Sequence, residues 1–214
     1  EVDSDASSEL DSTTSSVIET DEMSVHFLEL GNKYTGDCTL IKVGDTEVLI
    51  DAGSRKDSAP TITSYVNQYC TDGKLEYVIA THAHQDHIAG FVGNNNQGIF
   101  DVYRIGTLID FPREGVSTQI YNNYETKRSS IIAKGTKHYT ALQWWKEEKG
   151  LTRSIEIADG ITMNVLYQKS YEVDASEEND YSVCVMFSQG ENHYLFTGDL
   201  EEKGEASLVE KNKL

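Results

Sequence analysis

Three of the six histidines of the chain and an aspartate lie close together in the segment THAHQDHIAG, residues 81–90. His82 and His84 are two positions apart, so in an extended segment their side chains point to the same side and can bind one metal ion together. Asp86 and His87 follow where the next helix is predicted to begin, and the turn there can direct them to a second ion. Neutral imidazole is the usual ligand of zinc and related divalent metals. The spacing therefore predicts a site for two adjacent ions, which would clamp a scissile group and lower the pKa of a bridging water.

The histidine segment directly follows LEYVIAT, residues 75–81, a nearly continuous apolar run that predicts a strand buried on both faces. A histidine-rich surface turn and histidines satisfied inside the core are the alternatives. Three histidines and a carboxylate at the end of a buried strand favour metal binding over both.

Two aspartates elsewhere hold matching positions. Asp51 ends the predicted strand 46–51 and Asp199 follows the predicted strand 192–198, so both stand where a strand runs into a turn that contains glycine. Carboxylates at several strand ends can converge on one edge of a β-sandwich. We therefore predict that Asp199 bridges the two metal ions and that Asp51 orients a ligand histidine. Capping of a turn is the alternative for each carboxylate.

The other three histidines are weaker candidates. His193 precedes Asp199 by six residues on one predicted strand, which at about 3.3 Å per residue places the two roughly 20 Å apart. His26, early on the first predicted strand, is interpreted as structural. His138 is predicted to lie on a loop between two helices, so it is kept as a further candidate ligand.

Alternating apolar runs, glycine-bearing turns and helical spacings predict the elements that position these residues. Three short strands joined by Gly and Asp turns predict an antiparallel meander, and later pairs of strands predict hairpins. A mixture of strands and helices of this kind predicts two sheets covered by helices. The predicted strands span residues 24–30, 38–43, 46–51, 75–81, 102–109, 154–158, 161–167, 181–188 and 192–198, and the predicted helices span residues 59–70, 116–133, 139–148 and 201–214.

The 214 residues, 38% of them hydrophobic, suffice for one core and predict one folded domain. Residues 1–22 hold eight acidic residues, no Lys or Arg and many Ser and Thr, which predicts a disordered arm or linker. The folded domain is predicted over residues 23–214. The formal net charge is −18, and −10 remains without the acidic arm, so the domain is expected to repel polyanions such as nucleic acid.

Cysteine usage and hydropathy exclude further classes of protein. Cys38, Cys70 and Cys184 are widely spaced and form no CxxC pair, which argues against a disulfide scaffold and a zinc ribbon and predicts three buried thiols. No run approaches the ~20 apolar residues of a membrane span. The acidic arm and a start at Glu1 rather than methionine predict an extracellular or cell-surface protein, with a cytoplasmic one as the alternative.

The motifs LIDAGS, THAHQDH and FTGDLE, in this order, resemble those of the metallo-β-lactamase superfamily. The resemblance implies a four-layer αββα sandwich that carries one or two metal ions. Within the superfamily, residues 24–214 look most similar to the soluble metallo-hydrolase domain of ComEC-type DNA-uptake competence proteins.

The resemblance also implies a role for each motif residue. His82 and His84 correspond to ligands of a first ion, Asp86 and His87 to ligands of a second, and Asp199 to the bridging ligand. Asp86 and Asp199 are thereby the implied catalytic carboxylates. Zinc is the implied metal, with manganese as the alternative.

Two departures from the family pattern bear on these roles. Many members carry a further ligand histidine upstream of the TGD motif, where this chain reads ENDYSV and Asn179 is the nearest candidate to support the first ion. The family also continues past the last helix to one more strand and a terminal histidine motif. The sequence ends at Leu214 without them, so the domain is expected to be C-terminally incomplete, lacking the last elements of the sandwich.

The predicted function is a metal-dependent hydrolase that activates water on one or two divalent ions, in a phosphodiesterase or nuclease-like reaction. A divalent pair suits in-line displacement at phosphorus. The acidic charge disfavours nucleic acid as the partner, and the short basic run at residues 126–130 predicts only a modest positive patch. Hydrolysis of a small ester, lactone or thioester is one alternative, and a non-catalytic metal-binding or scaffold module of the same fold is the other.

Overall fold

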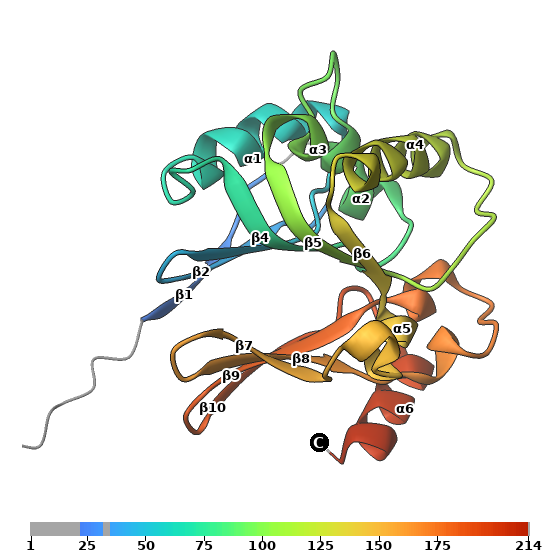
Figure 1. Ribbon diagram of the computed structural model, residues 1–214. Helices are drawn as coiled ribbons and strands as arrows, with labels where there is room; N and C mark the ends of the chain where they lie inside the picture. Colours follow the sequence, from blue (N-terminus) through green and yellow to red (C-terminus); the bar gives the residue numbers. More distant parts are fainter. Residues whose placement is uncertain (1–21, 32–34, 214) are drawn as a thin grey trace, which may run out of the picture.

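The computed structural model of the protein describes residues 22–31 and 35–213. The predicted acidic arm lies outside these residues except for Glu22, so its disorder stays a prediction. In the described part, two β-sheets face each other and helices cover their outer faces (Figure 1). The predicted layering of two sheets and covering helices is thereby confirmed as a mixed α/β fold. Within the described ranges, every helix falls short of the length and hydropathy that a membrane span requires.

The first sheet combines an antiparallel meander with parallel strands. Its order is β1–β2–β3–β4–β5–β6, with the first three strands antiparallel, as predicted, and β3 to β6 parallel. The parallel strands end at one edge of the sheet, where their loops can bring side chains together. The strands are β1 Met23–Phe27, β2 Thr39–Val43, β3 Thr46–Ile50, β4 Lys74–Ile79, β5 Arg104–Asp110 and β6 Lys137–Thr140.

Four helices cover one face of this sheet because they lie in the connections between its parallel strands (Figure 1). Their apolar side chains, such as Ile62 and Ile88, are fully buried in the core. Pro60 stands in the first turn of its helix, where a missing N–H costs nothing. The helices are α1 Ala59–Val66, α2 Gln85–Val92, α3 Ile99–Val102 and α4 Gln119–Ala133, and a short 3-10 turn, η1 Lys56–Ser58, precedes α1.

The second sheet is antiparallel throughout, in the order β10–β9–β8–β7, and confirms both predicted hairpins. The last helix packs on its outer face, where Leu200 and Leu208 form a small apolar cluster with Leu166 and Cys184 (Figure 1). The elements of this half are α5 Ala141–Trp145, β7 Ser154–Ala158, β8 Ile161–Leu166, β9 Cys184–Gln189, β10 Asn192–Phe196 and α6 Glu202–Asn212, with 3-10 turns η2 Glu148–Gly150, η3 Lys169–Tyr171 and η4 Glu178–Tyr181.

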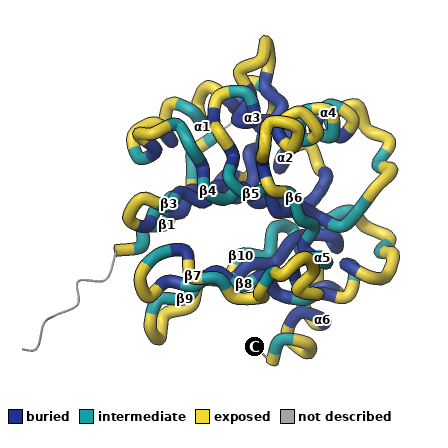
Figure 2. The backbone as a smooth tube through the Cα atoms, in the orientation of Figure 1, coloured by how far each residue is buried: buried dark blue, intermediate teal, exposed yellow. Residues whose placement is uncertain are grey.

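One hydrophobic core includes side chains from both sheets, among them Leu40, Ile109, Met163 and Phe187. Figure 2 shows the buried residues along the strands and the exposed residues on the outer surfaces of helices and loops. The three cysteines are free and buried, as predicted. Packing of the two sheets on a shared core therefore fixes the position of one sheet's loops against those of the other.

Sequence reasoning missed the strand β6 and the short helix α3, and it extended the helices α1 and α5 too far. β6 falls in a stretch predicted as loop and helix, so His138 lies on a strand rather than on the predicted loop. A four-residue strand of mixed polarity is too short for its period to be told from the start of a helix. α5 occupies only part of the predicted helix 139–148, and α1 ends at Val66 rather than at residue 70.

A buried ion pair at the end of β5 supports a stability prediction. The fully buried Asp110 carboxylate lies 2.7 Å from Arg128 Nη1, 2.9 Å from His138 Nε2 and 3.3 Å from the Tyr124 hydroxyl. Asp110→Ala leaves the half-buried guanidinium without its buried partner, so the free energy of unfolding should fall by about 3–5 kcal/mol. Urea denaturation measures this loss. The same change at Asp174, on an exposed loop, is the control; equal midpoints for the two variants would contradict the prediction.

Candidate metal centre

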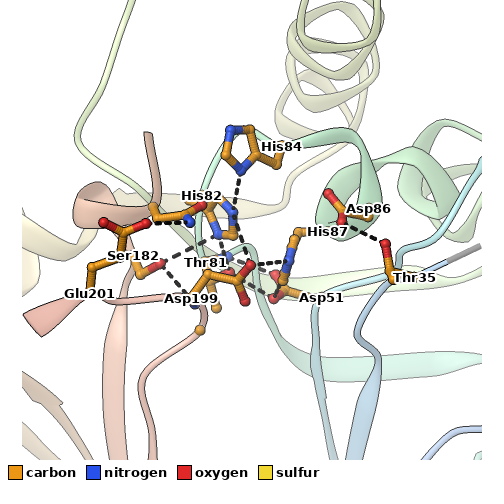
Figure 3. Close-up of polar contacts among 12 residues, drawn as sticks. Thr35, Asp51, Thr81, His82, His84, Asp86, His87, Ser182, Asp199 and Glu201 are labelled. Atoms are coloured by element: carbon orange, nitrogen blue, oxygen red, sulfur yellow. Dashed lines mark hydrogen bonds and ion pairs between the residues drawn. The ribbon is translucent and has the colours of Figure 1, made fainter. Parts of the chain in front are cut away.

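Four segments of the chain meet where β3 and β4 end and α2 begins (Figure 3). Asp51 follows β3, while Thr81 and His82 follow β4. His87 lies in the first turn of α2. Asp199 reaches the same place from the loop after β10, in the opposite sheet. The parallel pairing of β3 with β4, together with the packing of the sheets, therefore brings residues far apart in the sequence to one site.

His82, His87 and Asp199 form the compact centre of this site. His87 Nε2 is 3.2 Å from Asp199 Oδ2, and His82 Nε2 is 4.0 Å from the same oxygen. One ligand atom from each of the three residues lies within 4.8 Å of the others. Ligand atoms around one zinc ion, each about 2.0–2.2 Å from the metal, are separated by roughly 3–4 Å. Two imidazoles and a carboxylate at this spacing therefore fit a divalent metal ion.

Hydrogen bonds behind the imidazoles direct their Nε2 atoms into the centre. His87 Nδ1 is 2.8 Å from Asp51 Oδ2, and His82 Nδ1 is 3.1 Å from Thr81 Oγ1. The Asp51 carboxylate also accepts from Thr81 N at 2.8 Å and from Thr81 Oγ1 at 2.7 Å. In metal sites such contacts fix the tautomer and the orientation of a ligand imidazole.

The tautomer of His82 follows from these bonds. The Thr81 hydroxyl has one proton and gives it to Asp51, so toward His82 it can act only as an acceptor. His82 then carries its proton on Nδ1, beside the hydroxyls of Thr81 and Ser182, and its Nε2 lone pair faces the centre and the neighbouring His84 Nδ1. Burial, reinforced by the charge of His87, lowers the pKa of His82 to about 3, which keeps the ring neutral at pH 7.

His87, unlike His82, favours its protonated, positively charged form. Burial lowers its pKa, but Asp51 and Asp199 outweigh burial and raise the pKa of His87 to about 11. The hydrogen bond from His87 in turn lowers the pKa of Asp199. Without a metal, a proton on His87 therefore supplies the positive charge between two carboxylates, and a metal ion must displace this proton from Nε2.

The other predicted ligands border the centre without joining it. His84 Nδ1 is 3.0 Å from His82 Nε2, but the exposed His84 ring lies outside the compact group of three. The Asp86 carboxylate is directed to Thr35, whose hydroxyl donates to Asp86 Oδ2 at 3.4 Å (Figure 3). The structure thus brings together three of the five predicted ligands, and it places the other two beside them.

Asn179, predicted to support the first ion, lies on η4 and contacts the segment after Asp199. Its Nδ2 donates to Glu201 Oε1 at 3.0 Å, while its buried Oδ1 has no hydrogen-bond partner among the described residues. The contact ties η4 to the segment that carries Asp199, so Asn179 reaches the centre only indirectly.

Sequence reasoning missed Asp37, a further carboxylate beside the centre. Its N–H donates to the backbone oxygen of Asp86 at 3.2 Å. Partial burial raises the pKa of Asp37, His87 opposes this rise, and the anions Asp51 and Asp199 add to it. Position could have revealed this residue, because β2 is antiparallel to β3 and begins at the edge where β3 ends.

Two glycines allow the loops of the site to approach each other closely. A Cβ on Gly53 would lie 1.5 Å from the backbone oxygen of Asp86, and one on Gly198 would lie 2.8 Å from the Cβ of Thr81. Gly198 also has a φ of +54°, in the left-handed region that favours glycine. The glycines of the LIDAGS and FTGDLE motifs therefore determine how near these segments come to the start of α2.

The remaining histidines have partners elsewhere in the fold. His26 Nδ1 is 3.0 Å from the Tyr65 hydroxyl, and His193 Nδ1 is 2.8 Å from Ser188 Oγ. His138, which the sequence left as a candidate ligand, pairs with the buried carboxylate at the end of β5. These contacts give the three side chains structural partners.

The family model of the metallo-beta-lactamase superfamily matches residues 31–133, just under half of the chain. The matched stretch contains the histidine segment with His82, His84, Asp86 and His87. Two facing sheets with helices on their outer faces are consistent with the metallo-beta-lactamase fold. Proteins of this superfamily are generally hydrolytic metalloenzymes that bind divalent metals.

Several solved structures are similar to the chain at low identity. The metallo-beta-lactamase fold protein YhfI from Bacillus subtilis is 16% identical, with 83% of this chain and 62% of that protein covered and a TM-score of 0.49. A metallo-beta-lactamase from Hirschia baltica is 17% identical, with coverages of 82% and 65% and a TM-score of 0.38. The chain thus spans less than two thirds of the length of either protein. No curated protein sequence matches it.

Proposed function

We propose that the protein is a metal-dependent hydrolase of phosphodiesters. The observation that carries the proposal is the convergence of His82, His87 and Asp199, whose ligand atoms lie within 4.8 Å of one another. A divalent ion held there would polarise a phosphoryl oxygen and lower the pKa of a water molecule. Zinc suits two imidazoles and a carboxylate, and manganese is the alternative.

The exposure of the ligands defines an open side for substrate. His82 and His87 are buried, whereas the Asp199 side chain keeps 37% of its surface exposed and His84 is exposed. The buried imidazoles would hold the ion from inside, and Asp199 would complete the site at its solvent-facing side. A second ion bound by Asp86 would share the carboxylate with the Thr35 hydroxyl, which contacts Oδ2 at 3.4 Å.

Charge and motif resemblance support a short phosphodiester as substrate. A net charge of −18 opposes the approach of a long polyanion but costs a small ligand much less. The likeness of residues 24–214 to the metallo-hydrolase domain of ComEC-type proteins supports phosphodiester chemistry. We therefore propose that the substrate is a nucleotide or short oligonucleotide rather than duplex nucleic acid.

Metal analysis and hydrolysis together test the proposal. After loading with zinc or manganese and dialysis, the protein should retain one or two equivalents of metal and hydrolyse bis(p-nitrophenyl) phosphate, and EDTA should stop the reaction. Faster turnover of p-nitrophenyl acetate than of the phosphodiester would favour the small-ester alternative. Absence of bound metal would remove the proposal altogether.

A non-catalytic metal-binding module is the second candidate. It is favoured by one observation, that only three of the five predicted ligands converge. Stoichiometric metal binding without hydrolysis of either substrate would support this candidate against the hydrolase.

A further inference from the structure

A polar trough lies between η1 and α4 and passes the start of α2, beside the candidate centre. It consists of two hollows of about 460 Å³ and 260 Å³, which share Lys56 and Asn123 in their walls. Gln85, the first residue of α2, lines the larger hollow and directly follows His84 in the chain. Gln85 also stands two residues before His87, so the wall of this hollow includes part of the segment that carries the candidate ligands. We call it the η1–α4 trough.

Side-chain amides are the most frequent polar groups in the walls of the trough, with six of the fourteen lining residues. Gln85, Asn94, Gln119 and Asn123 line the larger hollow, and two further asparagines line the smaller one. Each amide offers donors and an acceptor in one group, which matches the base edges and hydroxyls of a nucleotide better than it matches an apolar ligand. An amide-rich wall therefore indicates a ligand with many polar groups.

Positive charge exceeds negative charge in the larger hollow. Arg55 and Lys56 line it together with a single carboxylate, Asp57. In a chain of net charge −18, a locally cationic hollow concentrates anions at that place. Lysine and arginine side chains are the usual partners of phosphate.

Several polar groups of the trough have no partner in the described part of the chain. Among the residues that the structure describes, the side chains of Lys56, Gln85 and Asn94 form no hydrogen bond or ion pair. Lys127 in the smaller hollow differs, because it pairs with Asp101 and also donates to Asn96 Oδ1 at 3.0 Å. The unpaired groups thus gather in the larger hollow, next to the centre.

We propose that the η1–α4 trough binds the nucleotide next to the scissile phosphodiester. Lys56 holds its phosphate, and the amides of Gln85 and Asn94 contact its base or sugar. This inference rests on the proposed function and narrows the substrate to a nucleotide chain with a phosphate beyond the cleaved one.

Equilibrium binding tests the inference without the metal. Calorimetry in EDTA measures the affinity of the protein for thymidine 3′,5′-bisphosphate. Lys56→Glu should raise the Kd about tenfold or more, because a charge-assisted contact to phosphate becomes repulsive. Lys134→Glu makes the same change of charge at the far end of α4 and should leave the Kd within twofold of the wild-type value. Lys56→Gln should give a smaller rise in the same direction, which separates loss of the contact from misfolding.

Three outcomes would overturn the inference. The first is that the wild-type protein does not bind the bisphosphate, and the second is that the Lys56 and Lys134 variants have equal Kd values. The third is that the protein binds inorganic phosphate as tightly as the bisphosphate. The proposed function is judged separately, by hydrolysis of bis(p-nitrophenyl) phosphate, which has no second phosphate. Lys134→Glu should leave that hydrolysis within twofold of wild type, whereas failure of the wild-type protein to hydrolyse it would count against the metal centre alone.

Discussion

Replacing Asp199 by Asn is expected to lower kcat/KM for phosphodiester hydrolysis by about 10³-fold, because the Lewis-acid contribution of a bound ion is worth several kcal/mol. Asparagine keeps the size of the side chain but removes the negative charge that lies 3.2 Å from His87 Nε2. A neutral amide is a poorer ligand than a carboxylate, so the bound metal measured by elemental analysis should fall with the activity.

Glu202→Gln is the matched control for this prediction. It makes the same change of charge three residues further on, at an exposed position that begins α6, and should leave metal content and activity unchanged. A second measurement does not depend on the reaction. In EDTA, NMR titration should show a lower pKa for His87 in the Asp199 variant than the value of about 11 that the two carboxylates maintain. Full activity and an unchanged His87 titration would place Asp199 outside the centre.

Sequence patterns predicted those parts of the fold that local interactions determine. The alternation and the glycine turns of the first three strands lie within residues 24–51, and neighbouring strands in the chain pair with each other there. The same is true of the two later hairpins. β6 escaped prediction because its four residues become a strand only through pairing with β5, which is far away in the sequence.

Individual residues of the candidate site could also be predicted from local sequence patterns. Strand ends bearing Asp51, His82 and Asp199 could be recognised one at a time, and side chains at several strand ends can converge on one edge of a β-sandwich. The strand ends do not show which of the histidines and carboxylates converge on one ion. Spacing by two pairs His82 with His84, and the structure does place His84 Nδ1 3.0 Å from His82 Nε2. Because the chain then turns into α2, it also brings the rings of His82 and His87 to 4.1 Å from each other, and His87 rather than His84 joins the compact group. That arrangement depends on Asp51, which holds His87 from a different strand.

Replacing Asp51 by Asn is expected to weaken metal binding about 10–100-fold, although Asp51 itself is not among the three converging ligands. Its carboxylate accepts from Thr81 N, Thr81 Oγ1 and His87 Nδ1, all within 2.8 Å. An amide brings two N–H donors to a place where three donors already point, so His87 loses its orientation. Competition with a chromogenic chelator measures the affinity. Asp45→Asn, on the exposed turn between β2 and β3, is the matched control and should bind metal as the wild type does.

The same substitution should change how the stability of the metal-free protein depends on pH. In the wild type the pKa of His87 is raised to about 11, above the ordinary value of 6.5, so the folded state keeps a proton that the unfolded state releases. The stability from this proton is complete below pH 6.5 and is lost as the pH rises toward 11, by up to about 1.4 kcal/mol per pH unit.

Asp51→Asn removes the anion that contributes most to the raised pKa of His87, so the variant has less stability to lose in this alkaline range. His82, whose pKa is lowered to about 3, stays neutral throughout the range and adds no slope. Urea unfolding in EDTA between about pH 7 and 9 should therefore show a loss that is smaller in the variant by roughly 1–2 kcal/mol. Parallel losses in the two proteins would mean that Asp51 does not hold the proton on His87, and the explanation of how this imidazole is oriented for metal would fail with it.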